Sequence, residues 1–255
     1  MNKNNYLSQP LLSFAIGLVV FTTLVMVQAL DALGQVNGPG TSDSALFDNV
    51  INLPPDPSIG NNDGIGGVPG MTTQLNVDDG GSIGFFFDAD AGTEVNIDGG
   101  QVGNGFDANS GSEINIRGGS LLAFDAGPGS LVDISGGSLG TFFAEGGSDV
   151  SISGGSFNNN FSARNGSNLD ISGGVFNDQF TANSGSTVNL SGGLFNDAVS
   201  LSGGSNVVVS GGLFGDDFSA SGVELIGGEF FLNNNPLANG GNVSFNDGDL
   251  SLIHI

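Results

Sequence analysis

The sequence predicts an all-β protein: a right-handed parallel β-helix (β-solenoid) of triangular cross-section, with about nine coils of 18–20 residues. Three observations lead to this fold class. A block of nearly constant length repeats along the chain, each block holds three short apolar segments, and turn-forming residues separate those segments. A chain with such a period buries its apolar side chains by stacking each unit on its neighbours.

The repeat is clearest in residues 147–165 and returns with substitutions from Gly166, Gly185 and Gly204. An apolar residue before each Ser-Gly-Gly turn, or its equivalent, forms a first column that sets the register. That column contains Val77, Ile97, Ile116, Ile134, Ile152, Ile171, Leu190, Val209, Leu225 and Phe245. With the apolar residue two positions earlier, it has the alternation of a strand with one buried face.

Two further apolar segments complete each coil. The second column follows the glycine pair and contains Ile83, Val102, Leu121, Leu139, Phe157, Phe176, Phe195, Phe214 and Phe230. The third segment is Phe-x-Ala in most coils, as at Phe161 and Ala163, and becomes Val199 and Leu201 in one coil. We expect all three segments to point inward, and the stacked phenyl groups of the second column to form an offset aromatic ladder.

Gly-Gly, Asn/Asp and Asn-Ser-Gly-Ser stretches separate the segments, and these residues favour turns. Several glycines in each coil disfavour a helix. Crossovers between parallel strands are right-handed in about 98% of cases, which favours the right-handed coil. The left-handed hexapeptide type would need a six-residue apolar repeat, which the sequence lacks.

The chain divides into three parts in order. Residues 1–29 have the pattern of a secretory signal peptide, with Lys3 before the apolar run Leu11–Val27 and a small-residue cleavage site ending at Ala29. The alternative is an uncleaved membrane anchor, for which the apolar run is short.

Residues 30–70 lack the repeat and are expected to form an N-terminal linker or cap, with a strand within residues 45–53. Residues 71–255 are the expected solenoid, and the pattern stops in mid-repeat, which predicts that the solenoid is truncated at its C-terminal end.

The composition narrows the functional classes. The net charge is −23, and beyond Lys3 the only strong cations are Arg117 and Arg164. Nucleic acid is therefore not an expected partner, because phosphate binding needs a basic surface. Cysteine is absent and the one histidine is His254, so a Ser-His-Asp triad, a cysteine nucleophile or a histidine zinc site within the repeats is not expected. We also expect no membrane insertion of the mature chain.

One carboxylate column is the candidate metal site. Asp178, Asp197 and Asp216 each lie two residues after the second apolar column, and stacking in register would place them about 4.8 Å apart. Calcium could bridge them through oxygen ligands. The competing interpretation is that these carboxylates are solvated and keep the protein soluble. A second outward column contains Asp88, Asp107 and Asp125, whereas Asn158, Asn177 and Asn196 are expected to form an amide ladder.

The block Gly-Ser-x-Val-x-Ile-Ser-Gly-Gly-Ser-Phe, followed by Phe-x-Ala, resembles the repeats of large secreted β-helical proteins of bacteria, in particular those of the planctomycete type. It is more loosely similar to haemagglutinin-like proteins and autotransporter passenger adhesins. The resemblance covers residues 71 to about 245 and implies an extracellular or cell-surface location. It carries no catalytic residues that could be transferred to this chain.

The resulting functional expectation is a secreted, non-catalytic structural or adhesive solenoid at the cell surface or in the extracellular matrix. Its outward Ser, Thr, Asn and Asp side chains would contact polysaccharide or other cell-surface components. The alternative is a carbohydrate-active β-helix enzyme, either a polysaccharide lyase or a hydrolase, that uses a pair of carboxylates. No pair of carboxylates stands out by position, which favours the non-catalytic interpretation.

Overall fold

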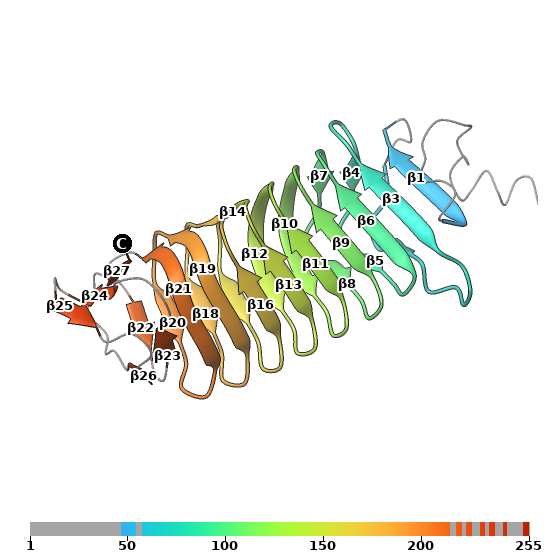
Figure 1. Ribbon diagram of the computed structural model, residues 1–255. Coiled ribbons are helices and arrows are strands. Elements are labelled where there is room, and N and C mark those ends of the chain that lie inside the picture. Colours follow the sequence, from blue (N-terminus) through green and yellow to red (C-terminus); the bar gives the residue numbers. More distant parts are fainter. Residues whose placement is uncertain are drawn as a thin grey trace, which may run out of the picture. The chain divides into compact units, whose positions relative to one another are not determined.

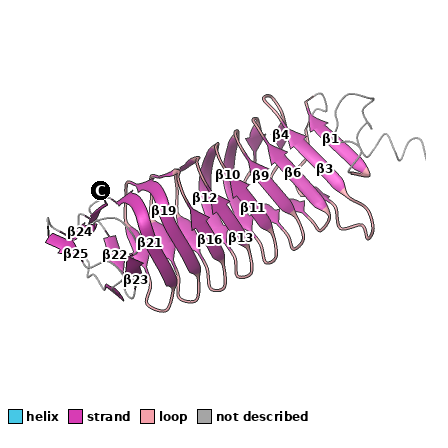
Figure 2. Cartoon of the chain, viewed as in Figure 1, coloured by secondary structure: helices cyan, strands magenta, loops and turns pink. Residues whose placement is uncertain are grey.

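The computed structural model describes residues 47–54 and 58–214, followed by the backbone of short strands between residues 218 and 254. The described part is all β-strand, turn and loop (Figures 1 and 2). Among these residues no helix is long and apolar enough to cross a membrane. The expected signal peptide, residues 1–29, and most of the linker that follows lie outside the described residues.

The first strand of each turn carries the first apolar column. These strands are β1 (Asn49–Leu53), β3 (Thr73–Val77), β6 (Thr93–Ile97), β9 (Glu113–Ile116), β11 (Leu131–Ile134), β13 (Asp149–Ile152), β16 (Asn168–Ile171), and the first parts of β19 (Thr187–Phe195) and β21 (Asn206–Phe214). Each pairs in parallel with the strand one turn earlier and one turn later, so that Ile152 lies opposite Ile134 on one side and Ile171 on the other. The predicted parallel solenoid is confirmed.

The second and third strands complete the three sides of each turn. Separate second strands are β4 (Ser82–Ile83), β7 (Gln101–Val102), β14 (Ser156–Phe157) and β17 (Val175–Phe176). Separate third strands are β2 (Gly64–Ile65), β5 (Phe87–Ala89), β8 (Phe106–Ala108), β15 (Phe161–Ala163), β18 (Phe180–Ala182), β20 (Val199–Leu201) and β22 (Phe218–Ala220). In β10 (Ser120–Ala126) and β12 (Ser138–Ala144) the second and third segments join into one strand, and in β19 and β21 the first and second segments do.

The coil is right-handed. In Figure 1 the first strands of the near side run upward, and each successive turn lies further to the left. About seven complete turns, from β3 to β20, are stacked in this way, which is slightly fewer than the nine expected.

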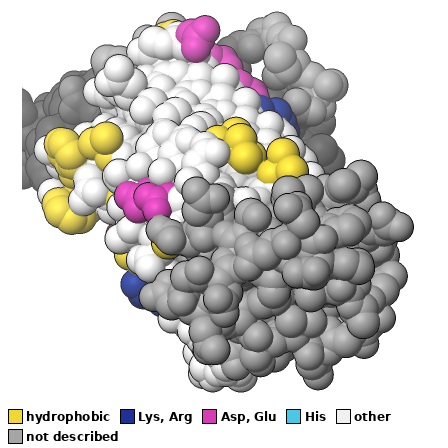
Figure 3. All heavy atoms as spheres, turned by 90° about the vertical axis from the view of Figure 1, so that its left-hand side faces the viewer, with side chains coloured by type: hydrophobic (Ala, Val, Ile, Leu, Met, Phe, Trp, Pro, Cys, Tyr) yellow, Lys and Arg dark blue, Asp and Glu magenta, His cyan; other side chains and the backbone are white. Residues whose placement is uncertain are grey.

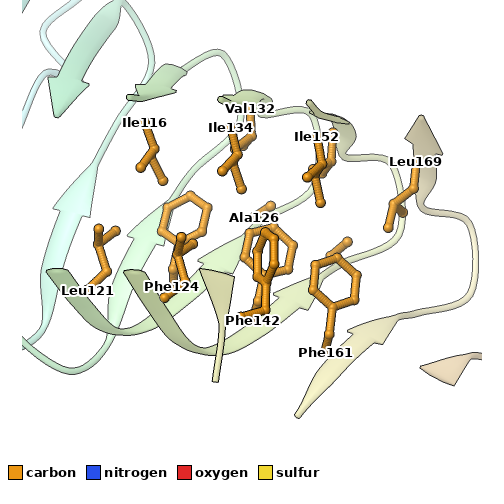
Figure 4. Packing of buried hydrophobic residues seen from close by; sticks show 14 of the residues in the cluster. Ile116, Leu121, Phe124, Ala126, Val132, Ile134, Phe142, Ile152, Phe161 and Leu169 are labelled. Atoms are coloured by element: carbon orange, nitrogen blue, oxygen red, sulfur yellow. The ribbon is translucent and has the colours of Figure 1, made fainter. Parts of the chain in front are cut away.

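The shared interior contains the three predicted columns. Ile116, Ile134, Ile152 and Ile171 are each at most 1% exposed. Figure 4 shows isoleucine side chains from the first strands pointing toward phenyl rings that come from the opposite strands. The rings of Phe157, Phe176, Phe195 and Phe214 stack with centroids 4.5–4.9 Å apart, as the aromatic ladder predicts.

The turns after the first strands depend on glycine at two positions. Gly155 has a φ of +89°, a conformation that other residues adopt only at a cost. Its neighbour Gly154 lies against the backbone of the previous turn, and a Cβ there would collide with the carbonyl oxygen of Ser135. The Gly-Gly pair therefore allows successive turns to approach to strand spacing.

A buried serine closes the corner before most first strands. Ser148 is fully buried, and its hydroxyl donates a hydrogen bond of 2.7 Å to the carbonyl oxygen of Glu145. The same bond to the residue three positions earlier is made by Ser112, Ser130, Ser167, Ser186 and Ser205. A buried hydroxyl needs such a partner, so the repeated Gly-Ser of the sequence is a structural corner.

The two ends differ from the sequence expectation. At the N-terminal end β1 pairs in register with β3, and Ile59 bridges to Ile83, so the ladder begins at Asn49, ahead of the coil start expected near Met71. A looser turn thus precedes the regular ones, and the repeat pattern hides it because the spacing to the next first strand is longer.

At the C-terminal end the regular coil stops after β22 and β23 (Val223–Leu225). The strands β24 (Phe230–Leu232), β25 (Asn235–Leu237) and β27 (Leu252–His254) pair antiparallel, and β26 (Asn242–Val243) is antiparallel to β23. The expectation that Phe230 and Val243 continue the parallel columns is therefore wrong, and Phe245 lies outside the described residues. The Asn-rich sequence before Pro236 favours a reversal of the chain over another coil.

Candidate functional site

The outward side chains of the first strands form a polar surface, which we call the first face. Strand alternation points every second residue outward. One outward column contains Asn76, Asn96, Asn115, Asp133, Ser151, Asp170 and Asn189. The column beside it contains Gln74, Glu94, Glu113, Leu131, Asp149, Asn168 and Thr187. Amide, carboxylate and hydroxyl groups thus repeat at strand spacing along this face.

An amide ladder stabilises the N-terminal end of the first face. The side-chain N–H of Asn76 donates to Asn52 Oδ1 at 2.8 Å, Asn96 donates to Asn76 at 3.1 Å, and Asn115 donates to Asn96 at 3.1 Å. Because each amide is held by its neighbours, hydrogen bonds fix the orientation of the ladder's side chains.

Charged groups flank this ladder. Glu94 Oε1 accepts hydrogen bonds from Gln74 at 3.1 Å and from Asn96 at 2.7 Å. Arg117 donates to Asp98 at 3.2 Å and to Asn96 at 3.3 Å. Asn96 and Gln74 are only 7% and 5% exposed, so this part of the face is ordered by buried hydrogen bonds.

Three shallow depressions follow one another along the first face. The first is lined by Phe47, Gln74, Asn76, Glu94, Asn96, Asp98 and Arg117. The second is lined by Glu113, Asn115, Leu131, Val132, Asp133, Asp149 and Ser151. The third is lined by Ser151, Ile152, Ser153, Asp170, Ile171, Ser172, Asn189 and Ser191. Ser151 belongs to both the second and the third, so these two adjoin, and a polymer could contact several depressions in succession.

A second polar surface is formed by the outward side chains of the third strands, which we call the third face. Asp88, Asp107 and Asp125 stand in register on it, and the same column continues as Phe143, Ser162, Thr181 and Ser200. Burial raises the pKa of Asp107, and the charges of Asp88 and Glu145 raise it further. Burial, together with Asp107 and Glu145, raises the pKa of Asp125 to about 6, although Arg164 acts in the opposite direction.

The acidic column ends at a cation. The Arg164 guanidinium lies 4.1 Å from the centroid of the Phe143 ring and pairs with the Glu145 carboxylate. Phe143 stands directly after Asp125 in the column. A positive charge on an aromatic ring beside a carboxylate is thus already present on the third face.

The predicted calcium column is only partly described. Asp178 Oδ1 accepts a hydrogen bond of 2.7 Å from the backbone N–H of Gln179, and Asp197 accepts the same bond from Ala198. Asp216 lies outside the described residues. Within the described ranges no group of three or more His, Cys, Asp or Glu side chains is placed to hold a metal ion. Calcium at this column therefore stays a hypothesis.

The neighbouring amide ladder is confirmed. Asn177 donates to Asn158 Oδ1 at 3.0 Å, and Asn196 donates to Asn177 Oδ1 at 2.9 Å. The sequence interpretation did not identify the first face and did not pair Arg117 or Arg164 with a carboxylate. Both arginines pair with a carboxylate nineteen residues earlier, Asp98 and Glu145 respectively. That separation equals the common repeat length, so the spacing alone could have indicated both ion pairs.

Where Figure 3 shows described residues, most of the surface is backbone and uncharged polar side chains, and apolar side chains form small separate patches. Comparison of the chain with protein-family models, with curated proteins and with solved structures gives no match. The function is therefore inferred from the two faces themselves.

Proposed function

We propose that the protein is a secreted, non-catalytic structural or adhesive solenoid that binds polysaccharide at a cell surface or in an extracellular matrix. One observation carries the proposal: the run of depressions along the first face, lined by amide, hydroxyl and carboxylate groups at strand spacing. Such groups match the hydroxyls of a sugar chain as hydrogen-bond donors and acceptors. Each contact is worth only about 0.5–1.5 kcal/mol, so useful affinity comes from several sites on one polymer.

The charge of the protein supports a neutral or cationic partner. A net charge of −23 repels anionic polymers, including nucleic acid and acidic polysaccharide. The extracellular location is supported by the signal-peptide pattern of residues 1–29.

Binding should depend on the polar groups of the first face. In the third depression, Asn189 donates to Asp170 at 2.6 Å, and both side chains are available to a ligand. The double substitution Asp170→Ala and Asn189→Ala should weaken binding of a neutral polysaccharide by about 3- to 30-fold, because one or two hydrogen bonds are lost. Affinity electrophoresis or calorimetry against a panel of neutral polysaccharides measures this change.

The matched control is the pair Ser162→Ala and Thr181→Ala on the third face, which should leave that affinity unchanged. Equal affinity of the first-face variant and the unaltered protein would remove the first face as the binding surface.

The alternative enzymatic function is tested by incubating the same polysaccharides with the protein and measuring whether their chains become shorter. Turnover that disappears in Asp125→Asn would instead support a glycosidase, because a carboxyl group of raised pKa beside a second carboxylate is the pairing such enzymes use.

A further inference from the structure

An exposed apolar corner lies between the second and third strands, away from the first face. It consists of Phe85, Phe86 and Leu122, which are 45%, 58% and 55% exposed and which we call the aromatic corner. Phe85 and Phe86 follow Ile83 and Gly84, and Leu122 occupies the equivalent corner two turns later. The intervening turn has Gly103, Asn104 and Gly105 there, so it adds no apolar side chain to the corner.

The two rings are held in place by hydrogen bonds of the backbone. The N–H of Phe85 donates to Asn61 Oδ1 at 2.8 Å, and its carbonyl oxygen accepts from the N–H of Asn62 at 2.7 Å. The N–H of Phe86 donates to the carbonyl oxygen of Asn104 at 2.9 Å. Both residues therefore lie in the ladder between adjacent turns, and their rings are presented from a fixed backbone.

The Phe86 ring leans toward the next turn. A Cβ placed on Gly105 would lie 2.9 Å from Phe86 Cδ1, so the ring covers that glycine. Asp107 follows Gly105 by two residues, which places its Cα at most about 7 Å from the glycine. The exposed ring and the acidic column of the third face are thus adjacent.

The chain itself supplies little positive charge to this region. Of the two arginines in the described part, Arg117 pairs with Asp98 and Arg164 pairs with Glu145 at the far end of the acidic column. Asp88 and Asp107 stand side by side in register, and burial together with mutual repulsion disfavours the charged form of Asp107. A cation from outside would relieve this repulsion.

The far end of the same face shows which arrangement fits such a cation. There the Arg164 guanidinium lies on the Phe143 ring beside Glu145. At the aromatic corner the ring and the carboxylates are present, and neither arginine of the described part pairs with Asp88 or Asp107. A second copy of this chain is a poor occupant, because two molecules of charge −23 repel each other.

From this charge complementarity we infer that the aromatic corner, with Asp88 and Asp107, binds a polysaccharide that carries free amino groups, such as a glucosamine polymer. The apolar face of a sugar ring lies on Phe86 and its ammonium group faces the carboxylates. The inference rests on the proposed polysaccharide-binding function and gives it a ligand class. It adds a second site, separate from the depressions of the first face.

The test compares a glucosamine oligomer with its N-acetylated counterpart of equal length, both titrated by calorimetry into the full chain. The glucosamine oligomer should bind more tightly, and the difference should shrink as salt is added. Phe86→Gly should weaken its binding about 5- to 30-fold, the loss expected when the apolar area that the sugar ring buries on the phenyl ring is removed. Phe86 has a φ of +57°, which glycine adopts freely, so this variant should fold at least as well as the unaltered protein.

Leu213→Ser, which removes a side chain that is also 55% exposed, is the matched control and should leave the affinity unchanged. Asp107→Asn should reduce the salt dependence. Equal binding of both oligomers, or full affinity in Phe86→Gly, would overturn the inference. Tighter binding of an oligolysine of equal charge would identify a basic peptide as the occupant and would also overturn it.

The two proposals fail in different ways. If the aromatic corner does not bind the glucosamine oligomer, Phe86→Gly leaves the affinity for that oligomer unchanged, while Asp170→Ala with Asn189→Ala still weakens binding of neutral polysaccharide. If no saccharide of either kind binds, both proposals are lost.

Discussion

The N-terminal and C-terminal halves of the solenoid build the same turn from different interiors. From β4 to β12 the second column is aliphatic, with Ile83, Val102, Leu121 and Leu139. From β14 onward it is aromatic, with Phe157, Phe176, Phe195 and Phe214. The third column is phenylalanine through most of both halves, so the comparison isolates what the second column does.

Ring geometry changes with the second column. Where that column is aliphatic, neighbouring third-column rings are inclined to one another, edge to face at 69° for Phe87 and Phe106 and tilted at 42° for Phe124 and Phe142. Where it is aromatic, rings in both columns stack, with angles of 5° for Phe157 and Phe176 and 20° for Phe161 and Phe180. The two ladders then contact each other edge to face, at 74–85°. Stacking within a column follows from the in-register spacing of parallel strands, which nearly equals the preferred offset-stacking distance.

The outer surface changes at the same place. The third face is acidic in the N-terminal half and continues with Ser162, Thr181 and Ser200 in the C-terminal half. Phe143, Glu145 and Arg164 lie at the junction. One repeat therefore carries two combinations, an aromatic second column with an uncharged third face and an aliphatic second column with an acidic third face.

The largest expected effect concerns the aromatic interior. Phe176→Ala should lower the free energy of unfolding by about 3–5 kcal/mol, because it leaves a cavity and removes the stacked contacts to Phe157 and Phe195. Leu121→Ala in the aliphatic half should cost about 2–3 kcal/mol, since no ring pair is lost with it. Urea unfolding followed by circular dichroism measures both, and a loss in Phe176→Ala no larger than that in Leu121→Ala would contradict a stabilising contribution from ring stacking.

The parallel coil and its three inward columns could be predicted because each inward position recurs in block after block. The positions at which the regular coil begins and ends could not be predicted. The turn of β1 and β2 carries the same interior contacts but has a longer loop around Pro54, so its spacing hides it. After β23 the apolar residues continue, yet the strands pair antiparallel, because alternation alone does not fix the direction of a strand.

The candidate site was harder to predict than the core. Outward residues vary from block to block, and their importance depends on neighbours one turn away, such as Asn76 beside Asn96 and Arg117 beside Asp98. Lateral pairs of this kind are visible in a sequence only when residues one period apart are compared directly. The turn at Ser148 could be predicted, whereas the burial of its hydroxyl and the hydrogen bond that closes the corner could not.

A smaller effect is expected from the acidic half as pH changes. The folded-state pKa values of Asp107 and Asp125 lie above their usual value of 3.8, and that of Asp125 is about 6. Between about pH 4 and pH 6 the folded protein therefore holds more protons than the unfolded chain, and stability falls as pH rises through this window. Because both side chains are partly exposed, we expect a change on the order of 1 kcal/mol after solvent screening.

Asp125→Asn should remove most of this dependence and raise stability near pH 7, which urea midpoints at several pH values would show. Asp133→Asn, an exposed carboxylate on β11 of the first face, serves as the control and should leave the acidic-window change in place. A fall in stability toward pH 4 in both variants and in the unaltered protein would contradict the expected sign of the pH dependence.

The smallest effect is expected at the junction. Arg164→Ala removes an ion pair that is partly exposed and a contact with Phe143, so it should cost about 1 kcal/mol near pH 7. Arg117→Ala removes an ion pair with Asp98 in which both side chains are about half exposed, without an aromatic contact, and should cost about 0.5 kcal/mol or less.

The same pair of variants separates charge from packing. Arg164 opposes the rise in the pKa of Asp125, so its removal should move that pKa further above about 6, whereas Arg117→Ala should leave it in place. Carboxyl chemical shifts followed by NMR across the titration measure this directly. If Asp125 titrates unchanged in Arg164→Ala while stability still falls, Arg164 acts through its contact with Phe143, and the junction is a packing feature rather than an electrostatic end to the acidic column.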